Sequence, residues 1–353
     1  MTEAPAAADV PAPSRYVGAW RRGHAVPAGQ LDFPPIRNGV DYLRSVVEHL
    51  GEDREDDDPR AVKYAVLHLQ AAAEVLLKTY LLHEHWALIV ADPGKASKKA
   101  FESGDFKSCT MEQAMDRLKN IAGITITDPD RKALAALNDD RNQLQHYGLT
   151  HSTKTVEARA AAALDFLVRF LDTHLLPRLD TDARMEIWHE MARVREGLKQ
   201  IESYVKERMN RLRGELQGQE TRTLHCPECD QPAFVVGPGS AVCHFCGQDY
   251  TEAIVLVMLF GAFWEEDSRQ CPACNAPTLF DDISFLEPPV PGEPAYSYCF
   301  ACDSTFTHLA SCERCHRPVE SQPDDGTGPS PQVLCPDCVG HAYPPEEHEN
   351  TGG

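Results

Sequence analysis

The stretch CPECDQPAFVVGPGSAVCHFC, residues 226–246, begins and ends with a Cys-x-x-Cys pair, and 13 residues separate its two pairs. The same spacing recurs in four more pairs towards the C-terminus, so twelve of the 13 cysteines are paired in this way. The twelve are Cys226, Cys229, Cys243, Cys246, Cys271, Cys274, Cys299, Cys302, Cys312, Cys315, Cys335 and Cys338. Two Cys-x-x-Cys turns can place four thiolates around one tetrahedral ion. The spacing therefore predicts metal sites in this part of the chain.

Pairing of consecutive turns predicts three small β-rich modules of the zinc-ribbon kind within residues 223–341. They would span 226–246, 271–302 and 312–338. Each would hold one structural zinc ion, because four protein ligands leave no open position for a substrate. Other pairings remain open, including interleaved ones as in RING domains, and His316 or His341 could replace a thiolate. Iron–sulfur clusters or thioredoxin-like redox pairs fit six matched pairs less well.

The residue after the second cysteine supports a tight turn at four of the pairs. These positions hold Asp230, Gly247, Asn275 and Asp303. Asp, Asn and Gly tolerate positive backbone φ angles, which are common after such turns. The thirteenth cysteine, Cys109, lies outside the pairs and is predicted to be a small buried residue rather than a nucleophile.

Charge and hydropathy narrow the class of function. The chain carries a formal charge of −20, and residues 223–353 hold 3 Arg, no Lys and 20 Asp plus Glu, a net charge of −17. Such a surface repels a polyphosphate, so we expect no DNA binding by the zinc modules and a protein partner instead. No run of 18 apolar residues and no secretory signal occurs, which predicts no membrane contact and a cytoplasmic location with reduced thiols.

The N-terminal part has a helical period. Residues 1–30, rich in Ala and Pro, are expected to be a disordered tail, as are residues 342–353. Within an all-α domain at 31–180, helices are predicted over 38–51, 60–91, 110–122, 129–147 and 154–176, with no strand.

A long amphipathic helix is predicted at 181–220. Between Ala183 and Leu216 its apolar residues follow a heptad stripe with one stutter. A coiled-coil stripe needs a partner helix, either in a second copy of the chain or in the preceding bundle. Further on, the apolar run AIVLVMLFGAFW from Ala253 to Trp264 is expected to form a shared core that joins the metal modules to each other or to the helical domain, the alternative being an exposed partner-binding patch.

The sequence LNDDRNQLQHYG, from Leu137 to Gly148, carries a second pattern. Arg and His separated by four residues occur four times in the chain, so the spacing alone carries little information. Only Arg141 is followed by an asparagine, Asn142, and only His146 falls in the last turn of a helix stopped by glycine. The helix dipole favours a protonated imidazole there, which suits proton transfer near neutral pH.

This element, preceded by the long helix HLQAAAEVLLKTYLLHEHWALI from His68 to Ile89, resembles a HEPN domain over residues 31–180. The resemblance implies a helical bundle that dimerises and brings two Arg/His pairs to one cleft. Many HEPN domains are metal-independent endoribonucleases of bacterial toxin and anti-phage systems, and others only bind nucleotides, RNA or protein. A HEPN subgroup regulated by nucleotidyl transfer carries Tyr two residues after His; here Gly148 stands there, so we do not predict that modification.

The sequence thus predicts a multidomain protein: an all-α HEPN-like bundle, a coiled-coil helix and an acidic zinc array. Arg141, Asn142 and His146 are the candidate catalytic residues for RNA cleavage to a 2′,3′-cyclic phosphate, with RNA held by the helical domain of a homodimer. The zinc array would regulate or recruit, in stress or anti-phage defence. The alternative is a non-catalytic dimeric adaptor whose zinc modules bind a protein. The lysine-rich stretch Lys95–Lys107 is a solvated loop with a lesser chance of facing phosphate.

Overall fold

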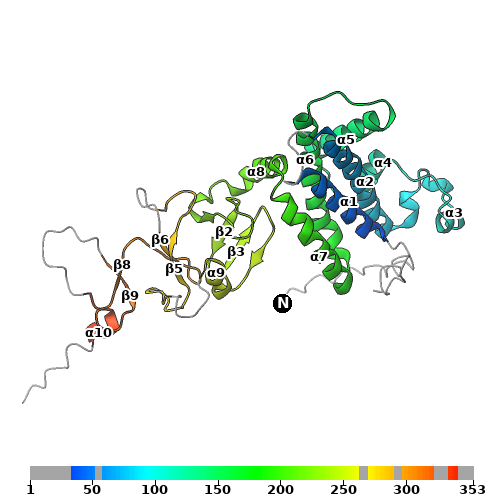
Figure 1. Cartoon of the computed structure of the whole chain (residues 1–353). Helices are drawn as coiled ribbons and strands as arrows, with labels where there is room; N and C mark the ends of the chain where they lie inside the picture. The colour runs from blue at the N-terminus through cyan, green and yellow to red at the C-terminus, as the bar shows by residue number, and fades with distance from the viewer. Residues whose placement is uncertain (1–32, 52–57, 262–268, 290–295, 322–332, 341–353) are drawn as a thin grey trace, which may run out of the picture. The chain divides into compact units, whose positions relative to one another are not determined.

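A computed structural model describes residues 33–51, 58–261, 269–289, 296–321 and 333–340 (Figure 1). The two predicted tails, most of the acidic 52–58 loop, residues 262–264 of the apolar run and His341 fall outside these ranges. The chain divides into two compact units, 1–210 and 211–353.

The first unit is helical. Its α-helices are α1 (Pro35–Leu50), α2 (Pro59–Glu84), α3 (Lys98–Ser103), α4 (Met111–Asn120), α5 (Asp128–His146), α6 (Thr153–Phe170), α7 (Thr181–Leu198) and the first part of α8 (Glu202–Leu216). In the described residues of this unit the only β pairing is an isolated bridge between Val90 and Ser108. The expected all-α character is therefore confirmed for the N-terminal part.

Local sequence sets the helix starts. Thr110 and Gln113 form a capping box at α4, and the side chains of Thr127 and Ser152 accept hydrogen bonds from the first turns of α5 and α6. The predicted helix over 60–91 is too long, because α2 ends at Glu84. His85 there has extended backbone angles, and its ring accepts a hydrogen bond from the backbone N–H of Ala87, starting a separate 3-10 turn.

Helix α2 is the central helix of the core. It packs against α1, α4, α5 and α6, and its residues Leu69, Leu76 and Leu77 are fully buried (Figure 1). Gly39 of α1 allows close approach, because a Cβ at that position would stand 2.4 Å from Leu76 Cδ2. An 18-residue window of α2 reaches the mean hydropathy of a membrane span, 1.2, and 61% of it is buried inside the bundle.

The segment predicted as one long helix is two helices. Helix α7 ends at Leu198, and α8 begins at Glu202 after a three-residue break. The expectation of a continuous helix was wrong, and the apolar stripe continues across the break because Leu198 and Ile201 are both buried. A heptad pattern with one stutter therefore did not require a continuous helix in this segment.

The partner of the stripe lies in the same chain. Helix α7 packs along α1, where a Cβ on Gly197 would stand 1.9 Å from Val47 Cγ1. Helix α8 is joined to α6 by a hydrogen bond from Ser203 to Glu157 and by a buried ion pair between Arg208 and Asp165. Of the two partners left open by the sequence, the preceding bundle is the one that these contacts show.

The second unit contains three small antiparallel sheets. The first is β1 (Thr223–Leu224), β2 (Phe234–Gly237), β3 (Ser240–Cys243) and β4 (Asp249–Tyr250), in that order. The second is β5 (Leu279–Ile283), β6 (Tyr296–Cys299) and β7 (Thr305–Phe306), and the third is β8 (Leu309–Ser311) with β9 (Pro318–Glu320). The described residues of this unit also form two short α-helices, α9 (Ala253–Leu259) and α10 (Pro336–Gly340), besides the end of α8 and the 3-10 turn Glu220–Arg222. The prediction of small β modules after a helical domain is confirmed.

The described part of the apolar run joins the first two sheets. It forms α9 and the following Phe260, whose ring lies 6.1 Å from Phe234, 6.0 Å from Phe280 and 5.3 Å from Phe300 between centroids. Phe234 belongs to the first sheet, and Phe280 lies in β5 of the second. The shared core expected from the sequence is thus seen for residues 253–260.

Candidate metal centres and the Arg141 helix end

Twelve cysteines gather into three groups of four. The groups follow consecutive pairing, and within each the four sulfur atoms lie within 4.8 Å of one another. They are Cys226, Cys229, Cys243 and Cys246; Cys271, Cys274, Cys299 and Cys302; and Cys312, Cys315, Cys335 and Cys338. In the first two groups the pairs lie beside the strands of the first and second sheets; in the third, one pair lies between β8 and β9 and the other at the start of α10.

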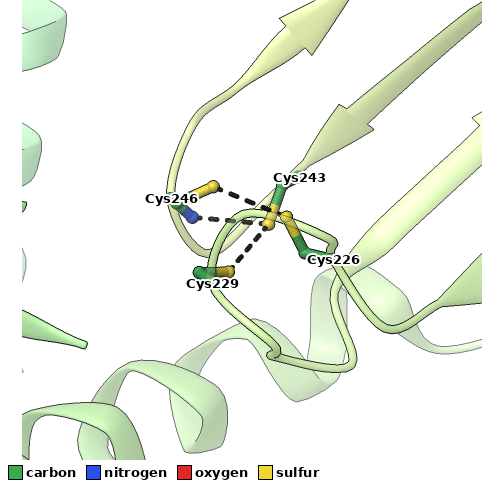
Figure 2. A group of neighbouring side chains, drawn as sticks. All are labelled: Cys226, Cys229, Cys243 and Cys246. Carbon is green, nitrogen blue, oxygen red and sulfur yellow. Dashed lines mark hydrogen bonds between the residues drawn. The ribbon is translucent and has the colours of Figure 1, made fainter. Parts of the chain in front are cut away.

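The sulfur spacing fits one four-coordinate ion per group. Zinc–thiolate bonds of about 2.3 Å in a tetrahedron give sulfur–sulfur edges of about 3.8 Å. The first group has edges of 3.8 Å between Cys226 and Cys246 and 3.7 Å between Cys229 and Cys243, and Figure 2 shows the four side chains converging from two facing turns. The second group has an edge of 3.6 Å between Cys274 and Cys299.

The turns repeat the same hydrogen-bond pattern. At the sixth pair, the N–H of Val339 donates to the carbonyl of Cys335 over 3.0 Å within helix α10; at the other five pairs, the N–H of the residue after the second cysteine donates in the same way to the carbonyl of the first, over 2.8–2.9 Å. That residue has a positive φ in every case: Asp230, Gly247, Asn275, Asp303 and His316. The turn chemistry predicted for the first four is confirmed. The fifth shows that His316 serves as a turn residue, and it does not belong to the third cysteine group.

Backbone N–H groups also point at the sulfurs. Cys246 N lies 3.4 Å from Cys243 Sγ, Ala273 N 3.3 Å from Cys271 Sγ, and Cys335 N 3.3 Å from Cys312 Sγ. Such donors stabilise thiolate charge, which a sulfur-ligated cation requires. Each group therefore has the donor set, spacing and surrounding N–H donors of a closed structural metal site.

The groups differ in exposure. Three of the four cysteines of the first group are buried, whereas Cys274 of the second group and Cys315 of the third group are exposed. Tyr298, buried beside the second group, donates a 2.6 Å hydrogen bond to Asp303, and burial raises the pKa of its hydroxyl.

The thirteenth cysteine, Cys109, is 1% exposed, and burial raises its pKa, in agreement with a packing role.

Arg141, Asn142 and His146 lie at the C-terminal end of α5. Arg141 Nη1 donates a 3.0 Å hydrogen bond to Asn142 Oδ1, and both side chains are half-buried. His146 is exposed in the last helical turn, next to Tyr147, which is 79% exposed. The helix stays closed through His146, and Gly148, with a φ of 98°, follows it. The structure brings Arg141 and Asn142 together and leaves His146 on a different face of the helix.

A buried carboxylate beside this motif was missed from the sequence. Asp140 is 2% exposed and forms a 3.2 Å ion pair with Arg159 of α6, and burial raises the pKa of Asp140 against the lowering effect of Arg159. The signal was present, because Asp140 is spaced three residues after the buried Leu137 and so falls on the inner face of α5. Arg159 also lines a shallow groove of about 730 Å³ between α5 and α6, with Lys132 and Lys154.

A scan of protein-family models, a search of curated proteins and a search of solved structures each return no match to this chain. The resemblance to HEPN domains accordingly rests on the residues of α2 and α5 and stays a prediction.

Proposed function

We propose that the chain is a homodimeric HEPN-like effector that binds RNA through its helical unit and cuts it without a catalytic metal. The observation that carries this proposal is the presentation of Arg141, Asn142 and His146 at the solvent-accessible end of α5. In this reading the Asn142 amide orients the Arg141 guanidinium through their 3.0 Å hydrogen bond. The guanidinium then braces two phosphate oxygens.

Helix geometry makes the active centre a shared one. Residues five apart on a straight α-helix point about 140° from each other, so Arg141 and His146 of one copy diverge. The closed last turn of α5 supports this divergence. A two-fold axis near the helix end lets Arg141 of one copy face His146 of its partner, which is the arrangement that an isologous dimer can supply twice.

The reaction needs a proton acceptor and charge stabilisation. His146 removes the proton from a ribose 2′-hydroxyl, which attacks the adjacent phosphorus; the bond to the 5′-oxygen breaks, and the protonated imidazole returns its proton to that oxygen directly or through water. Arg141 neutralises the charge that builds on the non-bridging oxygens. The products are a 2′,3′-cyclic phosphate and a 5′-hydroxyl end.

The three cysteine groups would each hold a zinc ion. Four thiolates and edges of 3.6–3.8 Å suit zinc, and the closed sites would stabilise the second unit rather than act on substrate. The charge of −17 from residue 223 onward directs this unit towards a basic protein surface and away from RNA and DNA. Regulation or recruitment in stress or anti-phage defence is the role we assign to it.

The test uses total RNA with EDTA in the buffer. Wild type should release fragments ending in 2′,3′-cyclic phosphate, and His146→Ala or Arg141→Ala should abolish them. His151→Ala is the matched control, since His151 is also exposed and lies five residues away, outside α5. Intact RNA with the wild type, or equal cleavage by all variants, would refute the nuclease.

A non-catalytic adaptor is the second candidate. The groove between α5 and α6 does not have Arg141 or His146 in its lining, which favours a surface role for them in a single copy. This function predicts that Cys226→Ser breaks a protein interaction while His146→Ala leaves activity in cells unchanged. A pull-down with both variants separates the two functions.

A further inference from the structure

The segment between α2 and α4, residues 85–109, forms an excursion held firmly at its base. Ala91 N donates to the carbonyl of Lys107 and Cys109 N to that of Ile89, each over 2.8 Å. The Arg117 guanidinium of α4 donates to the carbonyls of Leu88, Val90 and Ala91 over 2.6–2.9 Å. Two hydrogen bonds thus join the two ends of the excursion to each other, and three fix its first end to α4.

Four aromatic rings follow one another within the excursion. The centroids of His85 and Trp86 lie 5.4 Å apart, those of Trp86 and Phe101 5.3 Å, and those of Phe101 and Phe106 5.4 Å. Neighbouring rings are tilted by 35–45°. His85 is exposed and the other three residues are half-buried, so each residue of the row keeps part of its surface in contact with solvent. Rings in the interior of this unit, such as Phe166 at 4% and Phe170 at 2% exposure, are closed off.

Exposed lysines share the excursion with these rings. They are Lys95, Lys98, Lys99 and Lys107. The side chain of Lys95 is 87% exposed and lies 3.3 Å from Asp92. With the acidic Asp92, Glu102 and Asp105, residues 92–107 carry a net charge of +1 in a chain of −20. The lysine stretch singled out by its composition thus lies beside a preorganised aromatic row.

We propose that the 85–109 excursion is a binding platform for single-stranded RNA, with bases stacking on the Trp86–Phe101–Phe106 row and phosphates facing Lys98, Lys99 and Lys107. The proposal rests on the proposed function, in which the helical unit binds RNA, and adds where the strand is held. Stacking on aromatic rings beside cations is the usual way to hold single strands with little sequence preference, because every base has a π face. A base stacked in a duplex cannot offer that face.

The rigid base is what makes the platform effective. A flexible loop would lose conformational freedom on binding, whereas here Arg117 already holds residues 88–91, and backbone hydrogen bonds already tie residues 107–109 to them. The same rings also pack the excursion internally. The main variants should therefore replace the lysines and leave the rings in place. A ring should be replaced only by another ring or by leucine, and the fold of that variant should be verified.

The test measures anisotropy of a labelled 12-nucleotide oligouridine with the full chain in a His146→Ala background. Lys98, Lys99 and Lys107 changed together to Gln should weaken binding roughly tenfold at about 0.1 M salt, and the slope of log K against log salt should fall by about 2, at 0.7 per lost phosphate contact. The matched control changes three exposed lysines on other helices, Lys63, Lys132 and Lys206, and should alter affinity less than threefold. Circular dichroism verifies the fold of each variant.

Two further arms test stacking. An abasic strand of equal length should bind about tenfold more weakly than oligouridine, and a duplex should bind no better than the abasic strand. Trp86→Phe should retain affinity, and Trp86→Leu should lose the preference for bases over abasic sites. Equal affinity of the lysine variant and its control, or of the abasic and natural strands, would overturn the platform.

The readout separates this proposal from the nuclease. Lysine-dependent binding without any cleavage by the wild type removes the nuclease and leaves the platform standing. Cleavage by the wild type together with unchanged binding in the lysine variant removes the platform and leaves the nuclease standing. Absence of any binding to oligouridine removes the platform.

Discussion

Replacement of Asp165 by alanine should strongly destabilise the helical unit. Asp165 of α6 is 2% exposed and accepts hydrogen bonds from Arg208 of α8 over 2.9 Å and from Arg169 over 3.0 Å. Arg208 is itself only 8% exposed, so loss of the carboxylate leaves a buried guanidinium without this counterion. Breaking a buried pair from one side costs about 3–5 kcal/mol. Arg169 keeps Asp130, 2.7 Å away, so most of the cost falls on Arg208.

The assay is urea unfolding followed by helical circular dichroism, with the free energy of unfolding taken from the transition. Glu48→Ala is the control, because Glu48 pairs with Arg44 over a similar 2.8 Å but both side chains are about half exposed. Such exposed pairs contribute about 0.3–0.5 kcal/mol. Combining Asp165→Ala with Arg208→Met should recover part of the lost stability, since the unpaired charge is then gone.

The same measurement tests whether α8 is docked in its own chain. A cost below about 1 kcal/mol for Asp165→Ala, similar to that of an exposed pair, would mean that Arg208 is solvated. The stripe on α8 would then be available to a helix of another molecule, and our assignment of its partner would be wrong.

Three further predictions concern the metal groups, the shared centre and pH. Cys229→Ser should lower bound zinc in purified protein from about three equivalents to about two, and Cys109→Ala should leave it unchanged, as measured by elemental analysis. Mixing inactive Arg141→Ala and His146→Ala proteins should restore about a quarter of wild-type cleavage, because half the dimers are mixed and each has one intact shared centre; a centre within one copy would give none. Burial lowers the pKa of His174 below its ordinary 6.5. The stability that the neutral imidazole contributes to the folded state is therefore fully present above pH 6.5 and is lost as the pH falls through the lowered pKa. A fall in the urea midpoint over this pH range would show the loss.

The metal groups were the most predictable part of the molecule. A Cys-x-x-Cys turn is local, and its geometry follows from four residues and the φ of the next one. For that reason Asp230 and Asn275 could be assigned to positive φ from sequence alone, and the structure agrees. The role of His316 was harder to predict, because a histidine in this position can be either a turn residue or a metal ligand. In the structure His316 has a positive φ, and the neighbouring Cys315 is the residue whose sulfur lies close to Cys335, 3.6 Å away.

Helix ends and partners were less predictable, because tertiary contacts decide them. The apolar run after Glu84 continues the pattern of α2, yet the Arg117 guanidinium on α4 donates hydrogen bonds to the carbonyls of Leu88, Val90 and Ala91, in a segment where a 3-10 turn replaces the α-helix. The sequence around residues 88–91 does not indicate that an arginine 26–29 residues further along the chain will bind their carbonyl groups. Similarly, the apolar stripe of α7 and α8 predicted a partner surface, and a periodic pattern cannot say which molecule supplies it.

The buried pair of Asp140 and Arg159 bears on how the Arg141 helix end could work. Asp140 is adjacent to Arg141 and fixed to α6 by its 3.2 Å ion pair, so the end of α5 is anchored one residue before the candidate centre. A centre shared between two copies needs such anchoring, since each copy must present its half at a set distance before the other arrives. Asp140 is buried inside one copy, Arg141 and Asn142 next to it are half-buried, and His146 is exposed. In the dimer that we propose, this arrangement would let each copy hold its half of the centre in place before the other copy binds, so the proposed cleavage is to be measured on the dimer rather than on the monomer.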